Sequence, residues 1–249
     1  ATEDVNDKVK GKGIMKLKNK GYDVSVGLLR DEAVELNRRF FTYHIKKRPY
    51  IILKWAESLD GYIDIERDYK DRGVNWVSNE YYRILVHKWR SEEQSIMVGG
   101  NTIIKDNPLL DVRYVDGKLP VVVLYDRDLS LPKDSKIFNG ESKKLIFNPI
   151  KKGVDGLCEY IMVEKDIDEI DFILKELYSR NIQSIFVEGG TKLIMNFIKR
   201  NLWDEARIFY GNKCFYKGVK APFIEEGMEV YWDSYKGDKL VILRNKKQL

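Results

Sequence analysis

Short apolar runs alternate with amphipathic segments from residue 48 to the end of the chain, and this alternation constrains the fold more than any other feature. The runs that we interpret as strands lie within residues 48–61, 94–100, 119–126, 143–148, 157–163, 184–190, 205–211 and 238–245. The third of these, "LPVVVLYD", is continuously β-branched and apolar, which is typical of a strand buried on both faces. The alternation predicts an α/β fold with a mainly parallel central sheet and helices on both faces.

Three amphipathic segments between these runs are predicted helices. Residues 78–91 have helical spacing after a candidate cap at Ser78 or Asn79. Residues 166–181 begin with acids, which suit a helix N-terminus, and continue with apolar residues on one face. The segment "TKLIMNFIKRN" follows the Gly-Gly pair at 189–190.

The first 44 residues have a different pattern, with a helix, a short strand and a second helix. They contain too little apolar surface for an independent domain. The chain also begins with Ala rather than Met. We therefore expect a processed or truncated chain whose first part is the tail of something larger.

Composition excludes several classes of function. The 44 basic and 39 acidic residues are well mixed and leave a net charge of +5, which argues against a nucleic-acid arm but suits a small anionic substrate. Two distant cysteines, Cys158 and Cys214, imply no disulfide framework and favour a reducing cytoplasm. These cysteines and the two histidines, His44 and His87, lack the spacing of metal ligands, so we expect no metal. No apolar run approaches the roughly 20 residues of a membrane span.

Polar or glycine residues follow four of the predicted strands. They occur in "LKWAESLDG", "VGGNTIIKDNP", "LYDRD" and "VEGGTK". Ligands of parallel α/β sheets bind beyond the carboxyl ends of the strands. The four segments are therefore expected to face one cleft.

The segment "VEGGTKL" has two interpretations that its residues leave open. Its glycines allow close approach of a ligand, and the following helix start would favour a phosphate. Alternatively, the glycines serve only the geometry of a strand–helix turn. Glu188 ends a buried run, where a carboxylate is costly without a partner, and a polar substrate would be such a partner.

Other charged residues near the predicted strand ends have comparable alternatives. Lys54 interrupts an apolar strand and lies either on a solvent-facing edge or in a site. Asp60 and Gly61 have turn chemistry, so a structural role is expected. Arg90 and Arg113 are candidate anion ligands because a guanidinium binds phosphate bidentately, although a single arginine is usually solvated surface.

Four blocks in this order resemble the reductase domain of the bifunctional riboflavin-biosynthesis deaminase/reductase. "RPYIILKWAESLDG" is similar to that family's K-x-A-x-S-L-D-G strand, and "NWVSNEYYRILVHKWR" to its W-I-[ST] segment with a helix ending H-x-[LW]-R. "SIMVGGNTIIKDNPLLDVR" is similar to its V-G-x-x-T-V-x-x-D-[DN]-P-x-L-x-x-R block, and "SIFVEGGTKL" to its V-E-G-G block. The set covers nearly the whole chain and is specific, whereas one block alone would not be.

The N-terminal segment 9–41 resembles the last part of the same family's deaminase domain. We therefore expect a deaminase remnant over residues 1–46 and a reductase domain over 47–249. The deaminase zinc motif, H-x-E followed by P-C-x-x-C, is missing from this sequence, so no deaminase activity is expected from it.

The resemblance implies a dihydrofolate-reductase-like fold and one reaction. NADPH would reduce the ribosyl group of 5-amino-6-(5-phosphoribosylamino)uracil to the ribityl product, and family members are typically dimers or larger, so a homodimer is expected. Two alternatives stay open. One is reduction of the related 2,5-diamino-6-ribosylaminopyrimidinone 5′-phosphate, and the other is a non-catalytic nucleotide-binding remnant.

Matching motifs also assign roles to residues. The cofactor would contact Ala56, Trp76, Thr102, Asp106, Arg127, Gly190, Thr191, Lys192, Leu193, Ile194, Met195 and Asn196. The substrate would contact Val74, Arg90, Leu110, Arg113 and Glu188, with the two arginines holding its 5′-phosphate. Lys54, Asp106 and Glu188 are the candidates for proton handling and orientation, with Lys54 as the donor.

Three of the matched positions depart from the family pattern. Val74 stands where the family often has Ser, so only its backbone could hydrogen-bond there. Glu57 replaces a small residue, and Arg127 replaces Ser or Thr. Arg127 would either meet the 2′-phosphate of NADP or be exposed.

Overall fold

The chain divides into two compact units. The computed structural model describes residues 2–68 and 71–248. One unit comprises Ala1–Tyr50 and Leu174–Gln183, and the other comprises Ile51–Ile173 and Ser184–Leu249. All the sheet strands belong to the second unit, apart from the first residue of the first strand.

The first unit is helical. Its helices are α1 (Lys12–Asn19), α2 (Arg30–Leu36) and α3 (Arg38–Lys46), together with the part of α7 (Glu169–Ser179) from Leu174 onward. Of the first three, only α3 buries side chains, namely Thr42 and Tyr43. The Tyr43 hydroxyl donates to the backbone oxygen of Tyr178 at 2.8 Å. The short strand expected in this region is wrong, because residues 2–49 contain helices and turns but no strand. A strand needs a neighbour for its backbone hydrogen bonds, and the segment between α1 and α2 has none.

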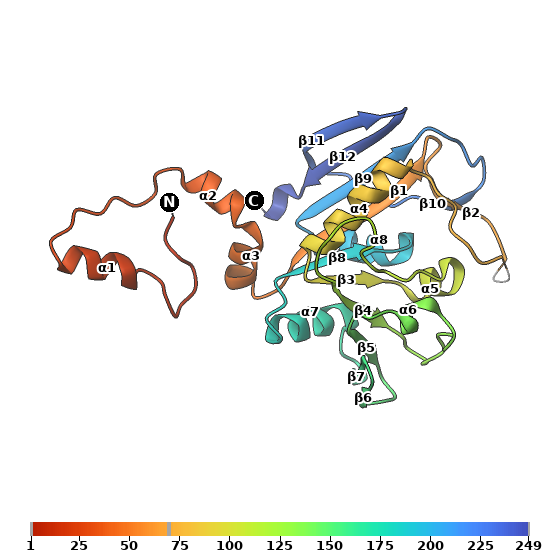
Figure 1. Ribbon diagram of the computed structural model, residues 1–249, viewed down its shortest axis with the longest axis horizontal. Helices are drawn as coiled ribbons and strands as arrows, with labels where there is room; N and C mark the ends of the chain where they lie inside the picture. Colours follow the sequence, from red (N-terminus) through yellow and green to blue (C-terminus); the bar gives the residue numbers. More distant parts are fainter. Residues whose placement is uncertain (1, 69–70, 249) are drawn as a thin grey trace. The chain divides into compact units, whose positions relative to one another are not determined.

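A ten-stranded sheet forms the centre of the second unit, in the order β11-β12-β9-β1-β8-β3-β4-β5-β7-β6 (Figure 1). The strands are β1 (Tyr50–Ser58), β3 (Ser95–Val98), β4 (Val121–Tyr125), β5 (Lys144–Asn148), β6 (Gly153–Asp155), β7 (Cys158–Met162), β8 (Ser184–Glu188), β9 (Glu205–Gly211), β11 (Met228–Tyr235) and β12 (Asp238–Arg244). β9 pairs in parallel with β1, and the strands from β8 to β7 pair in parallel with one another, whereas β12, β11 and β6 add antiparallel edges. The prediction of a mainly parallel sheet is confirmed.

Helices cover both faces of this sheet. The helices are α4 (Glu80–Glu92), α5 (Gly100–Asp106), α6 (Lys136–Asn139), α7 (Glu169–Ser179) and α8 (Thr191–Lys199). Trp89 of α4 stacks on Phe209 with ring centroids 5.5 Å apart and meets Phe186 edge-on, so α4 lies across β8 and β9 (Figure 1). Phe172 of α7 packs on Phe147 of β5. The register puts Phe147 and Phe186 on opposite faces, so the two helices cover opposite sides.

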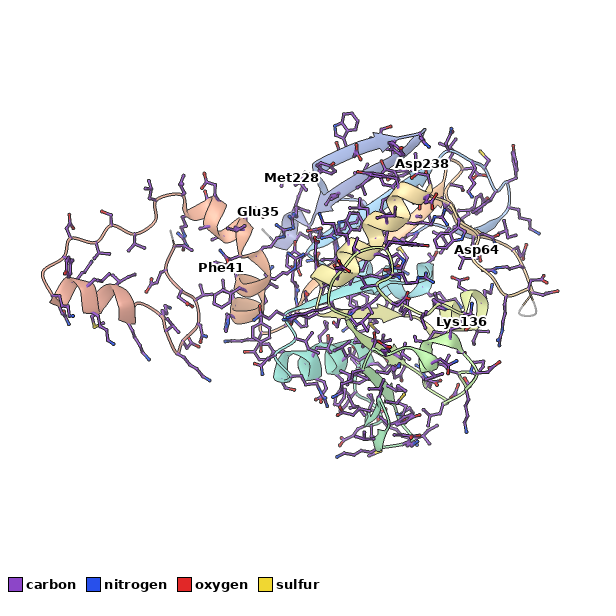
Figure 2. The ribbon with its side chains drawn as sticks, viewed as in Figure 1. Glu35, Phe41, Asp64, Lys136, Met228 and Asp238 are labelled. Atoms are coloured by element: carbon purple, nitrogen blue, oxygen red, sulfur yellow. The ribbon has the colours of Figure 1, made fainter. Side chains whose placement is uncertain are left out.

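The start of α4 is fixed by a cap and by a carboxylate from β12. Asn79 is the cap, and its side chain accepts a hydrogen bond from the backbone N–H of Tyr82. Asp238, labelled in Figure 2, accepts from the backbone N–H groups of Asn79 at 2.6 Å and Asn212 at 2.9 Å. These bonds fix the position of α4 over the sheet.

The sequence did not reveal four strands, β6, β11, β2 (Tyr62–Ile65) and β10 (Gly218–Lys220). β6 is exposed throughout and β11 along nearly all of its length. β2 and β10 form a separate two-stranded antiparallel sheet. Strands that bury little side-chain surface do not need the continuous apolar run that marks a buried parallel strand.

Candidate active site

Three charged side chains meet at the carboxyl end of β8. Glu188 is the last residue of β8, Lys54 lies on the neighbouring strand β1, and Arg90 lies on α4. Arg90 donates to both carboxylate oxygens of Glu188, from Nε at 2.7 Å and from Nη2 at 3.0 Å. The Lys54 Nζ is 3.5 Å from Oε2 of the same carboxylate. These side chains are only 11% to 18% exposed, so each charge depends on the others for its stability.

The two cations set the protonation state of Glu188. Burial alone would raise the pKa of Glu188, but the adjacent Arg90 and Lys54 outweigh burial and lower it to about 2. Burial lowers the pKa of Lys54, and the charge of Arg90 adds to this effect while Glu188 opposes it. At neutral pH Glu188 is therefore ionised, and Lys54 gives up its proton more readily than an exposed lysine does.

Arg113 lies beyond the Lys54–Glu188–Arg90 cluster, in the segment that follows α5. Its Nε is 3.1 Å from Oδ1 of Asp111, and the Nη1 of Arg90 donates to the backbone oxygen of Asp111 at 3.3 Å. The Arg113 side chain is 52% exposed, compared with 12% for Arg90. Leu110 is buried with a φ of 56°, so this segment presents backbone rather than side chain at that residue. Arg113 is thus the arginine of this pair that a ligand from solvent can reach more freely.

The two glycines after Glu188 have different structural demands. A Cβ on Gly189 would lie 2.9 Å from Cδ2 of Leu193, so a larger residue there would force the Leu193 side chain to shift. Gly190 has a φ of −69°, and a Cβ there would meet only Oγ1 of Thr102, at 4.0 Å. Neither backbone conformation nor packing requires glycine at position 190. The space beside Gly190 is open, and it lies at the start of α8, where no side chain caps the first N–H groups.

Asp106 is held by an arginine that sequence reasoning missed. The Nη2 of Arg67 donates to Oδ1 of Asp106 at 2.6 Å, and its Nε donates to Asp64 at 3.0 Å. Burial raises the pKa of Asp106, although Arg67 opposes this effect. Nothing in the segment "IERDYKDRG" distinguishes Arg67 from Arg72, so the sequence had no signal for this pairing.

The remaining predicted cofactor contacts are more dispersed. Ala56 lies on β1 opposite Phe209. Trp76 is 48% exposed beneath the guanidinium of Arg83, which is 4.6 Å from the ring centroid. Arg127 is exposed and pairs with Glu169 at 2.7 Å. Val74, which was predicted to contact the substrate, is also exposed, at 43%.

The structural role expected for the turn at Asp60 and Gly61 is confirmed. The Asp60 carboxylate accepts from the backbone N–H groups of Phe215 at 3.0 Å and Tyr216 at 2.6 Å. Gly61 has a φ of 79°, a conformation that favours glycine.

A disulfide, a cluster of metal-ligating side chains and a membrane-spanning helix are not found within residues 2–68 and 71–248. Cys158 and Cys214 are free thiols. No group of three or more His, Cys, Asp or Glu side chains in those residues could hold a metal ion. The helices described there are too short or too polar to cross a membrane.

The sheet and the polar residues near its carboxyl edge define an α/β domain whose candidate site lies at the carboxyl ends of β3 and β8 and beside the middle of β1. Residues 49–234 match the family described as the RibD C-terminal domain. The chain therefore belongs to the RibD C-terminal domain family.

Relatives and solved structures agree with this assignment. The chain is 36% identical over 241 residues to the riboflavin biosynthesis protein RibD of Aquifex aeolicus, covering 92% of this chain and 66% of that protein. It is 30% identical over 172 residues to the 2,5-diamino-6-ribosylamino-4(3H)-pyrimidinone 5′-phosphate reductase of Aquifex aeolicus, covering 66% of this chain and 77% of that protein. A crystal structure of a deaminase/5-amino-6-(5-phosphoribosylamino)uracil reductase from Thermotoga maritima has a TM-score of 0.85 at 31% identity, covering 98% of this chain and 69% of that one. The chain thus spans 66% of the length of the Aquifex aeolicus RibD protein and 69% of the Thermotoga maritima chain.

Proposed function

We propose that this chain is an NADPH-dependent reductase of the riboflavin pathway, which converts the ribosyl group of 5-amino-6-(5-phosphoribosylamino)uracil to the ribityl group. The main support is the Lys54–Glu188–Arg90 cluster, in which a buried lysine and an ionised carboxylate lie together at the carboxyl edge of the sheet. All three residues lie in motifs that resemble those of the reductase family.

The residues around Gly190 fit a nucleotide cofactor. The open space at Gly190 would admit a phosphate to the uncapped N–H groups at the start of α8, where the helix dipole favours negative charge. Thr102, within 4.0 Å of a Cβ built on Gly190, would line the same space. Gly190 to Asn196, Thr102, Ala56, Trp76 and Asp106 would hold the cofactor. Arg127 is the weakest member of the predicted set, because its exposed guanidinium already pairs with Glu169.

NADPH, when bound, supplies the hydride that the ribosyl C1′ accepts. The ribose ring opens in this reduction, so its ring oxygen needs a proton, and we propose that the Lys54 ammonium donates it. Glu188 is held ionised by Arg90, so its role is to orient Lys54 and to accept hydrogen bonds from the substrate rather than to donate a proton. Arg113, as the more exposed arginine, would bind the 5′-phosphate, and Arg90 would support it.

Reduction of the 2,5-diaminopyrimidinone analogue is the second candidate, because one relative bears that name. We favour the uracil substrate, since residues 9–41 resemble the tail of the bifunctional family's deaminase. Steady-state NADPH oxidation with each pyrimidine separates the two. A much higher kcat/KM for the uracil supports the proposal, and a higher value for the diaminopyrimidinone reverses the choice. Tight NADPH binding without oxidation of NADPH in the presence of either pyrimidine would indicate a non-catalytic remnant.

Three further properties belong to this proposal. We expect a cytoplasmic homodimer that prefers NADPH to NADH, as the family resemblance implies. We also expect no deaminase activity from residues 1–249, because they contain no H-x-E and P-C-x-x-C zinc motif. Light scattering after size-exclusion chromatography tests the dimer, and assays with both dinucleotides test the preference.

A further inference from the structure

His87 is a buried histidine of α4 to which the reaction proposed above gives no role. It is 4% exposed and lies one turn before Arg90, so the two side chains share a face of the helix. Its Nδ1 is 3.2 Å from the backbone nitrogen of Arg113, which donates a hydrogen bond to it. A ring nitrogen can accept such a bond only when it carries no proton. The geometry therefore requires a neutral imidazole with its proton on Nε2.

Two hydrogen bonds, from positions one turn apart on α4, help to attach the segment that carries Arg113 to that helix. Arg90 donates to the backbone oxygen of Asp111 at 3.3 Å, and His87 accepts from the backbone N–H of Arg113. Tyr114, the next residue of the segment, packs against the His87 ring edge-to-face, with the two ring centroids 4.7 Å apart. Removing either hydrogen bond would weaken the attachment of this segment to α4.

The charges around His87 favour the neutral form that this geometry requires. Burial lowers the pKa of His87, and the neighbouring Arg90 and Arg113 lower it further, whereas Asp111 and Glu188 oppose them. The balance leaves the pKa at about 4. The bond to Arg113 therefore persists through the neutral range, and His87 adds no positive charge that would compete with the arginines.

We propose that His87 is a positioning residue for substrate recognition, which acts through the backbone of Arg113 to hold the Arg113 guanidinium where it binds the substrate phosphate. The inference rests on the proposed function, because it assumes that Arg113 contacts the phosphate. His87 itself touches neither the pyrimidine nor the reacting atoms. Its effect should appear in the recognition of the phosphate and not in the binding of NADPH.

Two substitutions separate the hydrogen bond from the packing. Asn places its Oδ1 where His has Nδ1, so His87→Asn keeps an acceptor for the Arg113 N–H. Leu fills a similar volume with no acceptor, so His87→Leu loses the bond. Both variants lose the ring contact with Tyr114, so the difference between them isolates the hydrogen bond.

The experiment measures kcat/KM for 5-amino-6-(5-phosphoribosylamino)uracil and for its dephosphorylated form, with saturating NADPH. We expect His87→Leu to lower the ratio of the two values about tenfold, the loss of one hydrogen bond, and His87→Asn to keep a ratio near that of the wild type. The KM for NADPH should not change in either variant. A His87→Leu enzyme that keeps the wild-type ratio, or a His87→Asn enzyme that loses as much as His87→Leu, would overturn the inference.

Arg113→Ala, measured in parallel, separates this inference from the function on which it rests. An Arg113→Ala enzyme that keeps the wild-type ratio overturns the phosphate contact and the inference with it. A lower ratio in Arg113→Ala beside an unchanged ratio in His87→Leu overturns the inference alone. If His87→Leu does not fold, the imidazole ¹⁵N shifts of the wild-type protein provide a second test. The inference requires the Nε2–H tautomer at neutral pH, and an Nδ1–H tautomer or an imidazolium contradicts it.

Discussion

Two charge clusters lie on the α4 face of the same sheet and differ mainly in their access to solvent. The Lys54–Glu188–Arg90 cluster lies at the carboxyl end of β8, next to the half-exposed Arg113. The enclosed cluster consists of Glu93, Glu205, Arg207 and Arg244. Glu205 receives bonds of 2.6 Å from both Arg207 and Arg244, and the side chains of this cluster are at most 10% exposed.

The two clusters are neighbours, because Lys54 and Arg207 are partners in the register of β1 and β9. The Trp89 ring covers Arg207, with the ring centroid 4.4 Å from the guanidinium carbon, and the Phe186 ring centroid lies 5.7 Å from the same carbon. Similar charges therefore have different consequences. The enclosed cluster is closed to ligands and can serve only the fold. In the Lys54–Glu188–Arg90 cluster, by contrast, a ligand can approach the Lys54 ammonium, which carries a proton, and the Glu188 carboxylate.

Lys54→Met should give the largest effect on activity. Loss of the proton donor is expected to lower kcat roughly 100- to 10,000-fold, while Glu188 keeps its two bonds from Arg90 and the fold persists. Stopped-flow or steady-state NADPH oxidation measures kcat, and thermal unfolding checks the fold. The matched control is Lys88→Met, which removes an exposed lysine of α4 and should leave kcat unchanged. Comparable losses in the two variants would remove Lys54 from the reaction.

Glu205→Gln should lower stability and leave kcat unchanged, the reverse of what is expected for Lys54→Met. It leaves the buried Arg207 and Arg244 without their shared carboxylate, which typically costs about 3–5 kcal/mol of folding free energy. Urea unfolding measures the loss, and the folded fraction should keep its kcat. A Glu205→Gln enzyme of full stability and low kcat would reverse the distinction between the two clusters.

Acid should weaken the fold through Glu188. Its pKa is about 2 in the folded protein and near 4.5 when unfolded, so its contribution is fully present above pH 4.5 and is lost as the pH falls towards 2. The difference corresponds to roughly 3 kcal/mol. Unfolding free energies of wild type and Glu188→Gln, compared from pH 7 to pH 3, should converge as the pH falls. Parallel curves over this range would show that Glu188 is not held ionised by its neighbours.

Arg113→Ala should have the smallest of these effects. Removal of one charge-assisted phosphate contact is expected to cost about 1.5–3 kcal/mol, which raises the KM for the phosphorylated substrate roughly 10- to 150-fold. The KM for NADPH serves as the internal control and should stay constant. Equal increases in both KM values would contradict the assignment of Arg113 to the phosphate.

The central strands were predictable from the sequence, and Lys54 and Glu188 stood out as charged positions, because these features have local signals, whereas the contact of Arg90 with Glu188 has none. Buried parallel strands are continuous apolar runs, and Lys54 and Glu188 interrupt or end such runs. The prediction failed where the pattern depends on distant partners. β11 lies at the sheet edge and leaves its apolar residues Met228, Val230 and Trp232 exposed, and Arg67 reaches Asp106 across 39 positions of the sequence. Glu205 and Arg207 lie in a predicted strand, but their burial depends on Arg244 and Glu93 from elsewhere in the chain.

Transfer of deuterium is the most direct test of the reaction proposed for the Lys54–Glu188–Arg90 cluster. The enzyme is incubated with 5-amino-6-(5-phosphoribosylamino)uracil and NADPH deuterated on the transferred face of nicotinamide C4, and the product is examined by mass spectrometry. We predict a ribityl product that carries one deuterium on C1′, formed by the wild type and nearly absent with Lys54→Met. A product without deuterium, or labelled product formed equally well by Lys54→Met, would contradict the account.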